Sequence, residues 1–497
     1  MKLAALLSAL PIYNCNAIPN FTAPITRVTS RSQEVIPGTL FVCLDGLHVR
    51  GIQYAREALA RGAVAVVRTV SMRTDTILPS VFVPDTHIAL SLLCSAFYGN
   101  PARAMHITAV TGTNGKTSTV HFLEAIYRTY GYRTAMMGTI YDSVCGKALP
   151  PSGMTTPDPE EFYKRLAFFR KKKVTHLCME ASSHAMALDK LYGVSFANGV
   201  FTNLSADHLD FHKNTHAYLT AKAKLFPACR RSFFCMDDTV GRTLYERFAP
   251  HFDCVSYGVR HSADTCAEKQ QVLGADGIAY RLIAKKRPPL HIFVPVPGRF
   301  TFQNSLAAAT CALYDNISSE AIMTALATHK GIPGRLENIT PEGMPFTVFS
   351  DFAHTPDGLA KTISGVREFA KRGQKITVLF GCGGDRDAAK RPIMGEIAVT
   401  LADFVYITED NSRTESTGNI ISMICKDIVH RENFMVIHDR KTAIETAISN
   451  AEDGEILLLC GKGHETYIVR GTTKLPFSER EIVRSACNER RKEARSC

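Results

Sequence analysis

A glycine-rich segment at residues 111–117, TGTNGKT, carries the residue types best suited to binding phosphate. It follows an apolar run at 107–110 that predicts a strand, and it opens a segment with helical spacing. Glycines let backbone N–H groups approach phosphate oxygens, and a helix start adds the positive end of the helix dipole. Lys116 can reach the outer phosphates, and the Thr117 hydroxyl can ligate Mg²⁺. Val110 replaces the first glycine of the general pattern, but the strand–loop–helix context favours nucleotide binding over a structural turn.

Acidic and histidine side chains at the ends of two further predicted strands could complete a metal shell. Glu180 ends the apolar run 175–179, and His208 follows the short run 199–202. A carboxylate and a histidine at two strand ends could bind Mg²⁺ beside the phosphates, although such residues also serve as polar caps. His208 and His212 have the i, i+4 spacing of a metal pair. Without the glutamate of an HExxH motif, however, a zinc protease is disfavoured.

The elements that would position a second site are clearest in the last third of the chain. Apolar strands ending near residues 349, 380, 408 and 460 alternate with helical segments, which predicts a mostly parallel, doubly wound sheet. Ligands of such sheets bind beyond the carboxyl ends of the strands. We therefore expect the polar loops that follow these strands to share one site; they span 350–357, 381–387, 409–413 and 461–465.

Two breaks divide the chain into three predicted α/β domains. Gly-Asn-Pro at 99–101 closes a first stretch of short strands and helices, and Gly-Ile-Pro-Gly at 331–334 interrupts the second. We expect a smaller N-terminal α/β domain at 1–104. A central domain with a P-loop ATPase-like parallel sheet would follow at 105–333, and a C-terminal Rossmann-like doubly wound domain at 334–497.

Composition limits the classes of function. The 497 residues carry a net charge of +11, yet Lys and Arg are spread out and not interleaved with aromatic residues, which argues against nucleic-acid binding. No apolar run approaches the ~18 residues that span a bilayer. Residues 1–10 lack a clear signal-peptide cleavage site and are better explained as an amphipathic helix. The 15 cysteines form no CxxC pair, which is typical of reduced thiols. We expect a cytoplasmic monomer with no nucleic-acid partner and no membrane insertion.

Taken together, the motifs resemble the Mur ligase family and, within it, the MurE type. The resemblance covers nearly the whole chain, and the order and combination of the motifs are highly specific. DFAHTPD with GCGGDRD separates the chain from the related folylpolyglutamate and cyanophycin synthetases. The motifs are TGTNGKT (111–117), MEASSH (179–184), TNLSADHLDFH (202–212), GRLE (334–337), DFAHTPD (351–357), FGCGGDRD (380–387), DNSR (410–413) and GKGHE (461–465).

The resemblance implies an ATP-dependent amide ligase of peptidoglycan synthesis that uses ATP and Mg²⁺. Such enzymes activate the D-glutamate γ-carboxylate of UDP-N-acetylmuramoyl-L-alanyl-D-glutamate as an acyl phosphate and join it to a diamino acid. Lys222, which composition alone would assign to the surface, matches the family's carbamylated lysine. The implied catalytic residues are Lys116, Glu180, His208 and Lys222, and the implied metal ligands are Thr117, Glu180, His208 and Lys222. The implied nucleotide contacts are Gly112, Thr113, Asn114, Gly115, Lys116, Thr117, Asn304, Arg335 and Asp351.

The same resemblance assigns residues to the other substrates. Many members carry Asp in place of Thr29 and Arg in place of Lys190, and a lysine there keeps the charge but loses the bidentate fork. The UDP end would meet Ser30 and the loop near His48, and the muramoyl-dipeptide would meet Thr155, Thr156, Ser182 and Lys190. The amino-acid pocket would comprise Arg386, Asp410, Asn411, Arg413, Gly461 and Glu465.

The identity of the added amino acid depends on the DNSR motif at 410–413. Members that add meso-diaminopimelate carry DNPR, in which the arginine holds the distal carboxylate. Arg413 is kept here, whereas Ser412 replaces the proline, a change expected to free the loop. We therefore favour meso-diaminopimelate, with L-ornithine or L-lysine as alternatives. A P-loop kinase or ATPase, a nucleic-acid-binding ATPase and an inactive relative are remoter alternatives.

Overall fold

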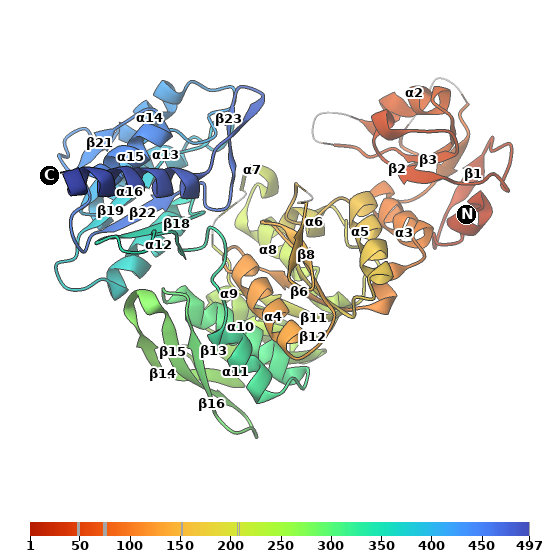
Figure 1. Cartoon of the computed structure of the whole chain (residues 1–497). Coiled ribbons are helices and arrows are strands. Elements are labelled where there is room, and N and C mark those ends of the chain that lie inside the picture. The colour runs from red at the N-terminus through yellow and green to blue at the C-terminus, as the bar shows by residue number, and fades with distance from the viewer. Residues whose placement is uncertain (47–49, 73–76, 151–152, 206, 208, 497) are drawn as a thin grey trace.

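The computed structural model describes residues 1–496 except 47–49, 73–76, 151–152, 206 and 208. It has three α/β domains, with the central one lying between the other two (Figure 1). We propose boundaries at 104/105 and 333/334, because the strands of one main sheet end before each point and those of the next begin after it. None of the helices in the described part of the chain combines the length and the hydropathy that crossing a membrane requires.

The N-terminal domain is a five-stranded sheet with helices α1 (Leu3–Leu7), α2 (Ala55–Ala60) and α3 (Thr86–Phe97). Within residues 1–10, Leu3–Leu7 form the helix α1, which buries Leu3, Leu6 and Leu7. Helix α3, capped by the Asp85 side chain, also packs against α5 (Pro159–Lys171) of the central domain. One apolar core therefore runs through both domains. The strand order is β1 (Asn14–Asn16), β5 (Ser80–Phe82), β4 (Ala63–Arg68), β3 (Thr39–Val42) and β2 (Arg27–Thr29).

The central sheet has eleven strands and is mixed, whereas the sequence predicted a parallel sheet. Its middle is parallel, as predicted, and antiparallel hairpins extend it at both edges. Helices α4 (Lys116–Thr129), α10 (Phe300–Tyr314) and α11 (Ser319–Ala327) cover one face. The strand order is β16 (Leu290–Val294), β15 (Ile278–Ala284), β14 (Thr265–Val272), β13 (Asp253–Gly258), β12 (Cys229–Cys235), β11 (Phe196–Phe201), β6 (His106–Thr111), β10 (His176–Glu180), β7 (Thr134–Met137), β8 (Asp142–Val144) and β9 (Lys147–Leu149).

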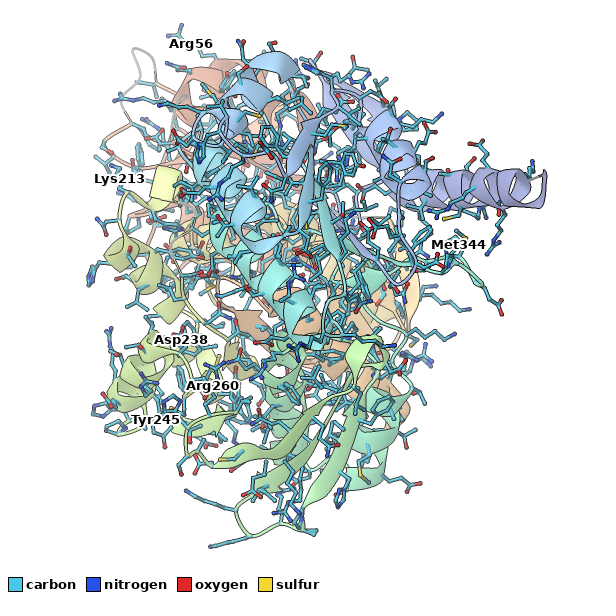
Figure 2. All side chains as sticks on the ribbon, turned by 90° about the vertical axis from the view of Figure 1, so that its left-hand side faces the viewer. Arg56, Lys213, Asp238, Tyr245, Arg260 and Met344 are labelled. Atoms are coloured by element: carbon cyan, nitrogen blue, oxygen red, sulfur yellow. The ribbon has the colours of Figure 1, made fainter. Side chains whose placement is uncertain are left out.

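Short helices lie on the other face of the central sheet and contact the loops that follow its strands. Asp238 begins α9 (Thr239–Phe248): its side chain accepts from the Gly241 amide at 2.9 Å and from the Leu204 amide at 3.2 Å. Asp238 and Tyr245 mark this helix in Figure 2. The Asp238 carboxylate thus ties α9 to the loop that follows β11. The remaining helices here are α6 (Ser183–Ala187), α7 (Leu209–His212) and α8 (Thr215–Ala223).

The C-terminal domain is the predicted doubly wound sheet, with one antiparallel edge strand. Helices α12 (Pro356–Phe369), α13 (Lys390–Leu401) and α14 (Thr417–Cys425) pack on one face. Helices α15 (Arg440–Ser449) and α16 (Glu479–Ser496) pack on the other. The strand order is β17 (Glu337–Asn338), β18 (Thr347–Asp351), β22 (Ile456–Cys460), β19 (Ile376–Phe380), β20 (Phe404–Ile407) and β21 (Phe434–Val436), and a separate hairpin joins β23 (Tyr467–Arg470) to β24 (Thr473–Pro476).

Candidate active site

The glycine-rich loop joins the end of β6 to the start of α4, as the sequence predicts. Gly112 and Gly115 have φ values of 152° and 85°, which strongly favour glycine. A Cβ on Gly112 would lie 1.9 Å from the Thr202 hydroxyl, and one on Gly115 would lie 2.3 Å from Oδ1 of Asn304. The loop therefore needs glycine for its backbone shape and for the close packing of its neighbours.

Two lysine amines converge on one carbonyl of this loop. Lys116 Nζ donates to the Gly112 and Thr113 carbonyls at 2.9 and 2.8 Å, and Lys222 Nζ on α8 donates to the Gly112 carbonyl at 2.7 Å. Lys222 is 1% exposed. Burial lowers the pKa of both amines, and burial together with the adjacent Lys116 charge lowers the pKa of Lys222 well below its ordinary value. Burial thus favours the neutral, nucleophilic form of the Lys222 amine.

An oxygen pair that suits Mg²⁺ lies at the same end of the sheet. The Thr117 hydroxyl, at the start of α4, is 3.1 Å from Oε1 of Glu180, the last residue of β10. Glu180 is 1% exposed, and its two carboxylate oxygens also accept from the Thr139 amide at 2.8 Å and the Thr139 hydroxyl at 3.0 Å. A hydroxyl and a carboxylate are hard oxygen donors of the kind Mg²⁺ prefers. His208, the fourth predicted metal ligand, lies outside the described residues.

Three of the residues assigned to the muramoyl-dipeptide cluster around Glu180. The Thr156 hydroxyl donates to the Glu180 carbonyl at 2.8 Å and accepts from the Ser182 amide at 3.0 Å. The hydroxyls of Thr155 and Thr139 are 3.0 Å apart. The network therefore places these polar groups beside the oxygen pair.

Lys190 and Ser30 lie away from that cluster, near the start of α5. Lys190 Nζ pairs with Asp158 at 2.7 Å, and Arg31 pairs with the other oxygen of the same carboxylate at 3.0 Å. The Ser30 amide and hydroxyl donate to Glu160. Asp158 and Glu160 thus connect the N-terminal and central domains. His48 falls in the segment outside the described residues.

The loops of the C-terminal domain build a second polar cluster. The Asn411 side chain donates to Glu465 at 2.9 Å and accepts from the Lys462 amine at 3.0 Å, and Lys462 pairs with Glu465 at 2.7 Å. A Cβ on Gly461, where φ is 109°, would lie 2.8 Å from an Asp410 carboxylate oxygen, so these two loops pack closely. The four predicted residues Asp410, Asn411, Gly461 and Glu465 therefore do meet.

Arg413 and Arg386 lie at the edge of this cluster. Arg413 Nη1 donates to the Gly384 carbonyl at 2.6 Å, and the Arg413 backbone pairs with the β23–β24 hairpin through Val469 and Gly471. Arg386 is exposed and bonds through its guanidinium to the Asp385 carbonyl at 3.2 Å. Both cations are therefore available beside the polar cluster.

Comparisons with known proteins agree with this geometry. Residues 110–312 match the Mur ligase middle domain, and residues 334–463 match the Mur ligase glutamate ligase domain. UDP-N-acetylmuramoyl-L-alanyl-D-glutamate–2,6-diaminopimelate ligases from Syntrophomonas wolfei and Geobacillus kaustophilus are 38% and 37% identical. Their alignments cover 92% and 99% of this chain and 94% and 100% of theirs. A solved ligase structure of the same description is 26% identical with a TM-score of 0.70, covering 99% of this chain and all of its own.

The chain belongs to the Mur ligase family. It is therefore an ATP-dependent ligase that forms an amide bond.

The remaining residues assigned to the nucleotide occupy the junction of the central and C-terminal domains of this Mur ligase. Arg335, in the segment between them, reaches the Thr117 hydroxyl at 3.4 Å, and its guanidinium lies 5.2 Å from the Phe352 ring centre. Asn304 projects from α10 onto Gly115. Asp351 instead accepts from the Leu336 and Ala353 amides at 2.7 and 2.8 Å, so it holds the inter-domain segment in place.

The structure also reveals residues that sequence reasoning left without a role. Asp357, in the DFAHTPD motif, accepts from Asn114 of the phosphate loop and from the Ser205 hydroxyl, each at 3.1 Å. Lys462, in the GKGHE motif, is fully buried in the amino-acid cluster. Their motifs could have indicated both residues, but Asn114, Ser205 and Asn411, which they contact, lie far away in sequence.

Buried Arg391 is a further residue of this kind. It makes two 2.8 Å bonds to Glu415 and donates to the Gly383 carbonyl at 3.2 Å, which braces the GCGGDRD loop against the DNSR loop. No motif indicated this pair, because Arg391 lies in α13 and Glu415 lies beyond the DNSR motif.

Proposed function

We propose that this ligase joins 2,6-diaminopimelate to the D-glutamate γ-carboxylate of UDP-N-acetylmuramoyl-L-alanyl-D-glutamate, using ATP and Mg²⁺, in peptidoglycan synthesis. The observation that carries the proposal is the meeting, at one end of the central sheet, of the half-buried Lys116 and buried Lys222 amines with the Thr117–Glu180 oxygen pair. The names of relatives 35–38% identical along nearly the whole chain support the choice of substrates. We further propose that the enzyme acts in the cytoplasm as a monomer, and light scattering would test the latter.

The proposed reaction has two steps. A γ-carboxylate oxygen attacks the γ-phosphorus of ATP, ADP leaves, and an acyl phosphate forms. The diamino acid's amine then attacks the acyl carbon: a C–N bond forms, the C–O bond to phosphate breaks, and the amine loses a proton. Lys116 would turn from its two carbonyl partners to offset charge on the phosphoryl oxygens.

Mg²⁺, when bound, would neutralise phosphate charge, and Thr117, Glu180, His208 and Lys222 are its proposed ligands. Lysine itself carries no oxygen, so its place in this set requires the carbamate that the family resemblance implies. The neutral Lys222 amine would add carbon dioxide and release a proton, giving an anionic group with two oxygens. The nearly complete burial of Lys222 beside the phosphate loop supports this assignment.

The anchored DNSR loop supports meso-diaminopimelate as the amino acid. Ser412, which replaces the proline, is buried. Its carbonyl oxygen packs against Gly384, where a Cβ would lie 1.9 Å from that oxygen. The Asn411 carbonyl accepts from the Gly384 amide at 2.9 Å, and Arg413 is fixed by the neighbouring hairpin. The loop that carries Arg413 is therefore held without proline, and the guanidinium can serve a distal carboxylate.

Amine-dependent phosphate release from ATP and the UDP-dipeptide tests the proposal with meso-diaminopimelate, L-lysine and L-ornithine in parallel. We expect a clear preference for meso-diaminopimelate. Arg413→Ala should lower kcat/KM for this amine about 100-fold, because a charged hydrogen-bonded partner is removed, and should leave the KM for ATP unchanged. Arg372→Ala, at an exposed arginine of the same domain, is the control. A preference for lysine or ornithine would mean that the pocket serves another amine, and no release with any of the three would refute the ligase assignment.

A further inference from the structure

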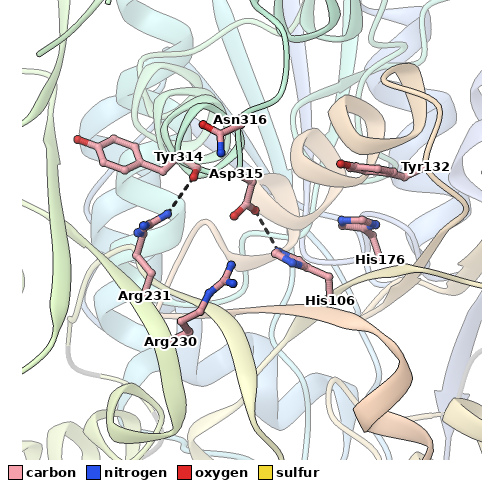
Figure 3. A pocket seen from close by; sticks show the side chains of 8 residues that line it. All are labelled: His106, Tyr132, His176, Arg230, Arg231, Tyr314, Asp315 and Asn316. Atoms are coloured by element: carbon pink, nitrogen blue, oxygen red, sulfur yellow. Dashed lines mark hydrogen bonds and ion pairs between the residues drawn. The ribbon is translucent and has the colours of Figure 1, made fainter. Parts of the chain in front are cut away.

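A second pocket lies at the opposite end of the central sheet from the phosphate loop. It has a volume of about 380 Å³ and opens beside His106 and His176, the first residues of β6 and β10 (Figure 3). Thr111, at the other end of β6, leads into the phosphate loop, and five residue steps of strand span ~17 Å. The pocket is therefore separate from the candidate active site.

The floor of the pocket is the buried carboxylate of Asp315, and only one of its two oxygens has hydrogen-bond partners among the described residues. Oδ2 of Asp315 accepts from the Asn198 side chain at 2.6 Å and from the Tyr127 hydroxyl, and it lies 3.0 Å from His106 Nε2. Oδ1 of Asp315 is buried and has no hydrogen-bond partner among the described residues. The Asp315 side chain is 5% exposed. Burial raises the pKa of this carboxyl, but the bonds from His106, Tyr127 and Asn198 more than offset that effect and lower it, so Asp315 is ionised at neutral pH.

A cation without a protein partner faces the same space. Arg230 is exposed, and its guanidinium makes no hydrogen bond or ion pair within the described parts of the chain. The adjacent Arg231 is already occupied, because it pairs with Asp253 at 2.8 Å and donates to the Tyr314 carbonyl at 2.9 Å. Figure 3 shows the Asp315 carboxylate between His106 and these two arginines.

The third wall is aromatic and uncharged. The Tyr132 ring stacks on the His176 ring with centres 3.7 Å apart and planes 10° from parallel. Burial lowers the pKa of His176 to about 4, so its ring is neutral at physiological pH. Such a wall suits an apolar or planar side chain.

We propose that this pocket binds a free amino acid in its zwitterionic form. The ammonium group would pair with the ionised Asp315 carboxylate, the ligand's carboxylate would pair with Arg230, and its side chain would lie against Tyr132. A carboxylate that is nearly buried and ionised favours a charged donor beside it. A purely anionic ligand such as phosphate would be repelled by Asp315, which is why both charges are required.

Calorimetry on the full chain with L-phenylalanine as the probe tests this site. Phenethylamine and 3-phenylpropionate each carry only one of its two charges. We expect L-phenylalanine to bind at one site, and each half-probe to bind about ten-fold more weakly or worse. Binding of 3-phenylpropionate as tightly as L-phenylalanine would overturn the proposal, because it would leave Asp315 without a function there. The absence of any binding heat with L-phenylalanine would overturn it too.

Variants locate the site. Arg230→Ala, at an exposed side chain, should weaken L-phenylalanine binding about ten-fold or more, and Asp315→Asn should do the same. Arg413→Ala should leave the affinity unchanged, which separates this pocket from the amino-acid cluster of the C-terminal domain. Wild-type affinity in Arg230→Ala, or a loss confined to Arg413→Ala, would refute the proposal, whatever the outcome of the ligase assay.

Discussion

At the scale of single residues, Lys222 shows how environment decides chemistry. On a helix surface it would be a solvated cation, but here the residue is 1% exposed and its amine lies 2.7 Å from a phosphate-loop carbonyl. Lys224, two residues later, is exposed and forms an ordinary ion pair with Asp189 at 2.9 Å. Because surface ion pairs contribute little, Lys224 is a matched control on the same helix end.

Lys222→Arg should abolish catalysis and leave nucleotide binding intact. A guanidinium stays protonated and cannot form a carbamate, so we expect turnover to fall about 100-fold or more. The affinity for ADP without metal should stay within about two-fold, and Lys224→Arg should behave as wild type. Steady-state kinetics and calorimetry give the two readouts. Wild-type turnover in Lys222→Arg would rule out a carbamate at this position.

At the scale of elements, the shape of the phosphate loop depends on close packing by a strand end, two helix ends and a neighbouring loop. Gly115 begins α4 with φ at 85°, and the Asn304 side chain of α10 occupies the space where a Cβ would point. Gly131, just beyond the other end of α4, has φ at 103° with nothing within 4 Å of its Cβ position. These two glycines share a positive φ and differ in packing.

A comparison of Gly115→Ala with Gly131→Ala therefore separates the effect of backbone strain from the effect of the contact with Asn304. Each should cost about 1–3 kcal/mol of stability, because alanine is strained at positive φ. Only Gly115→Ala should also weaken ATP binding, since its methyl group displaces the Asn304 amide. Thermal unfolding and nucleotide titration measure the two effects. Equal ATP affinity in both variants would mean that Asn304 does not support the nucleotide.

At the scale of the whole molecule, Asp357 connects the C-terminal domain to the phosphate loop. It sits in the first turn of α12 and accepts from Asn114 and Ser205 of the central domain. Lys361 pairs with the same carboxylate at 2.8 Å but belongs to the same helix. In the proposed reaction, docking of the two domains would exclude water from the acyl phosphate, which water would otherwise hydrolyse.

Asp357→Ala should uncouple ATP cleavage from amide formation. Loss of the two inter-domain bonds favours an open arrangement, so we expect more than one phosphate released for each amide bond formed. Lys361→Ala, which removes only the contact within the helix, should keep the ratio at one. Parallel assays of phosphate and ligated product give this ratio. A ratio of one together with wild-type kcat in Asp357→Ala would exclude a role in closure.

The sequence alone determined the family, the three-domain α/β plan and the phosphate loop. These features depend on local spacing: glycines between a strand and a helix, and polar loops after apolar strands. The roles of the individual site residues, including His48 and His208, stay predictions.

Only the tertiary structure decided which side chains meet across long stretches of chain. The antiparallel edges of the central sheet, the Arg391–Glu415 brace, the Asp357 contact and the Asp315 pocket all join residues that no local pattern connects. Hydrogen bonding and burial act through space, and the pKa of Lys222 depends on what packs around it. Local spacing therefore predicted which loops form the candidate site, and folding determined which residues each side chain contacts.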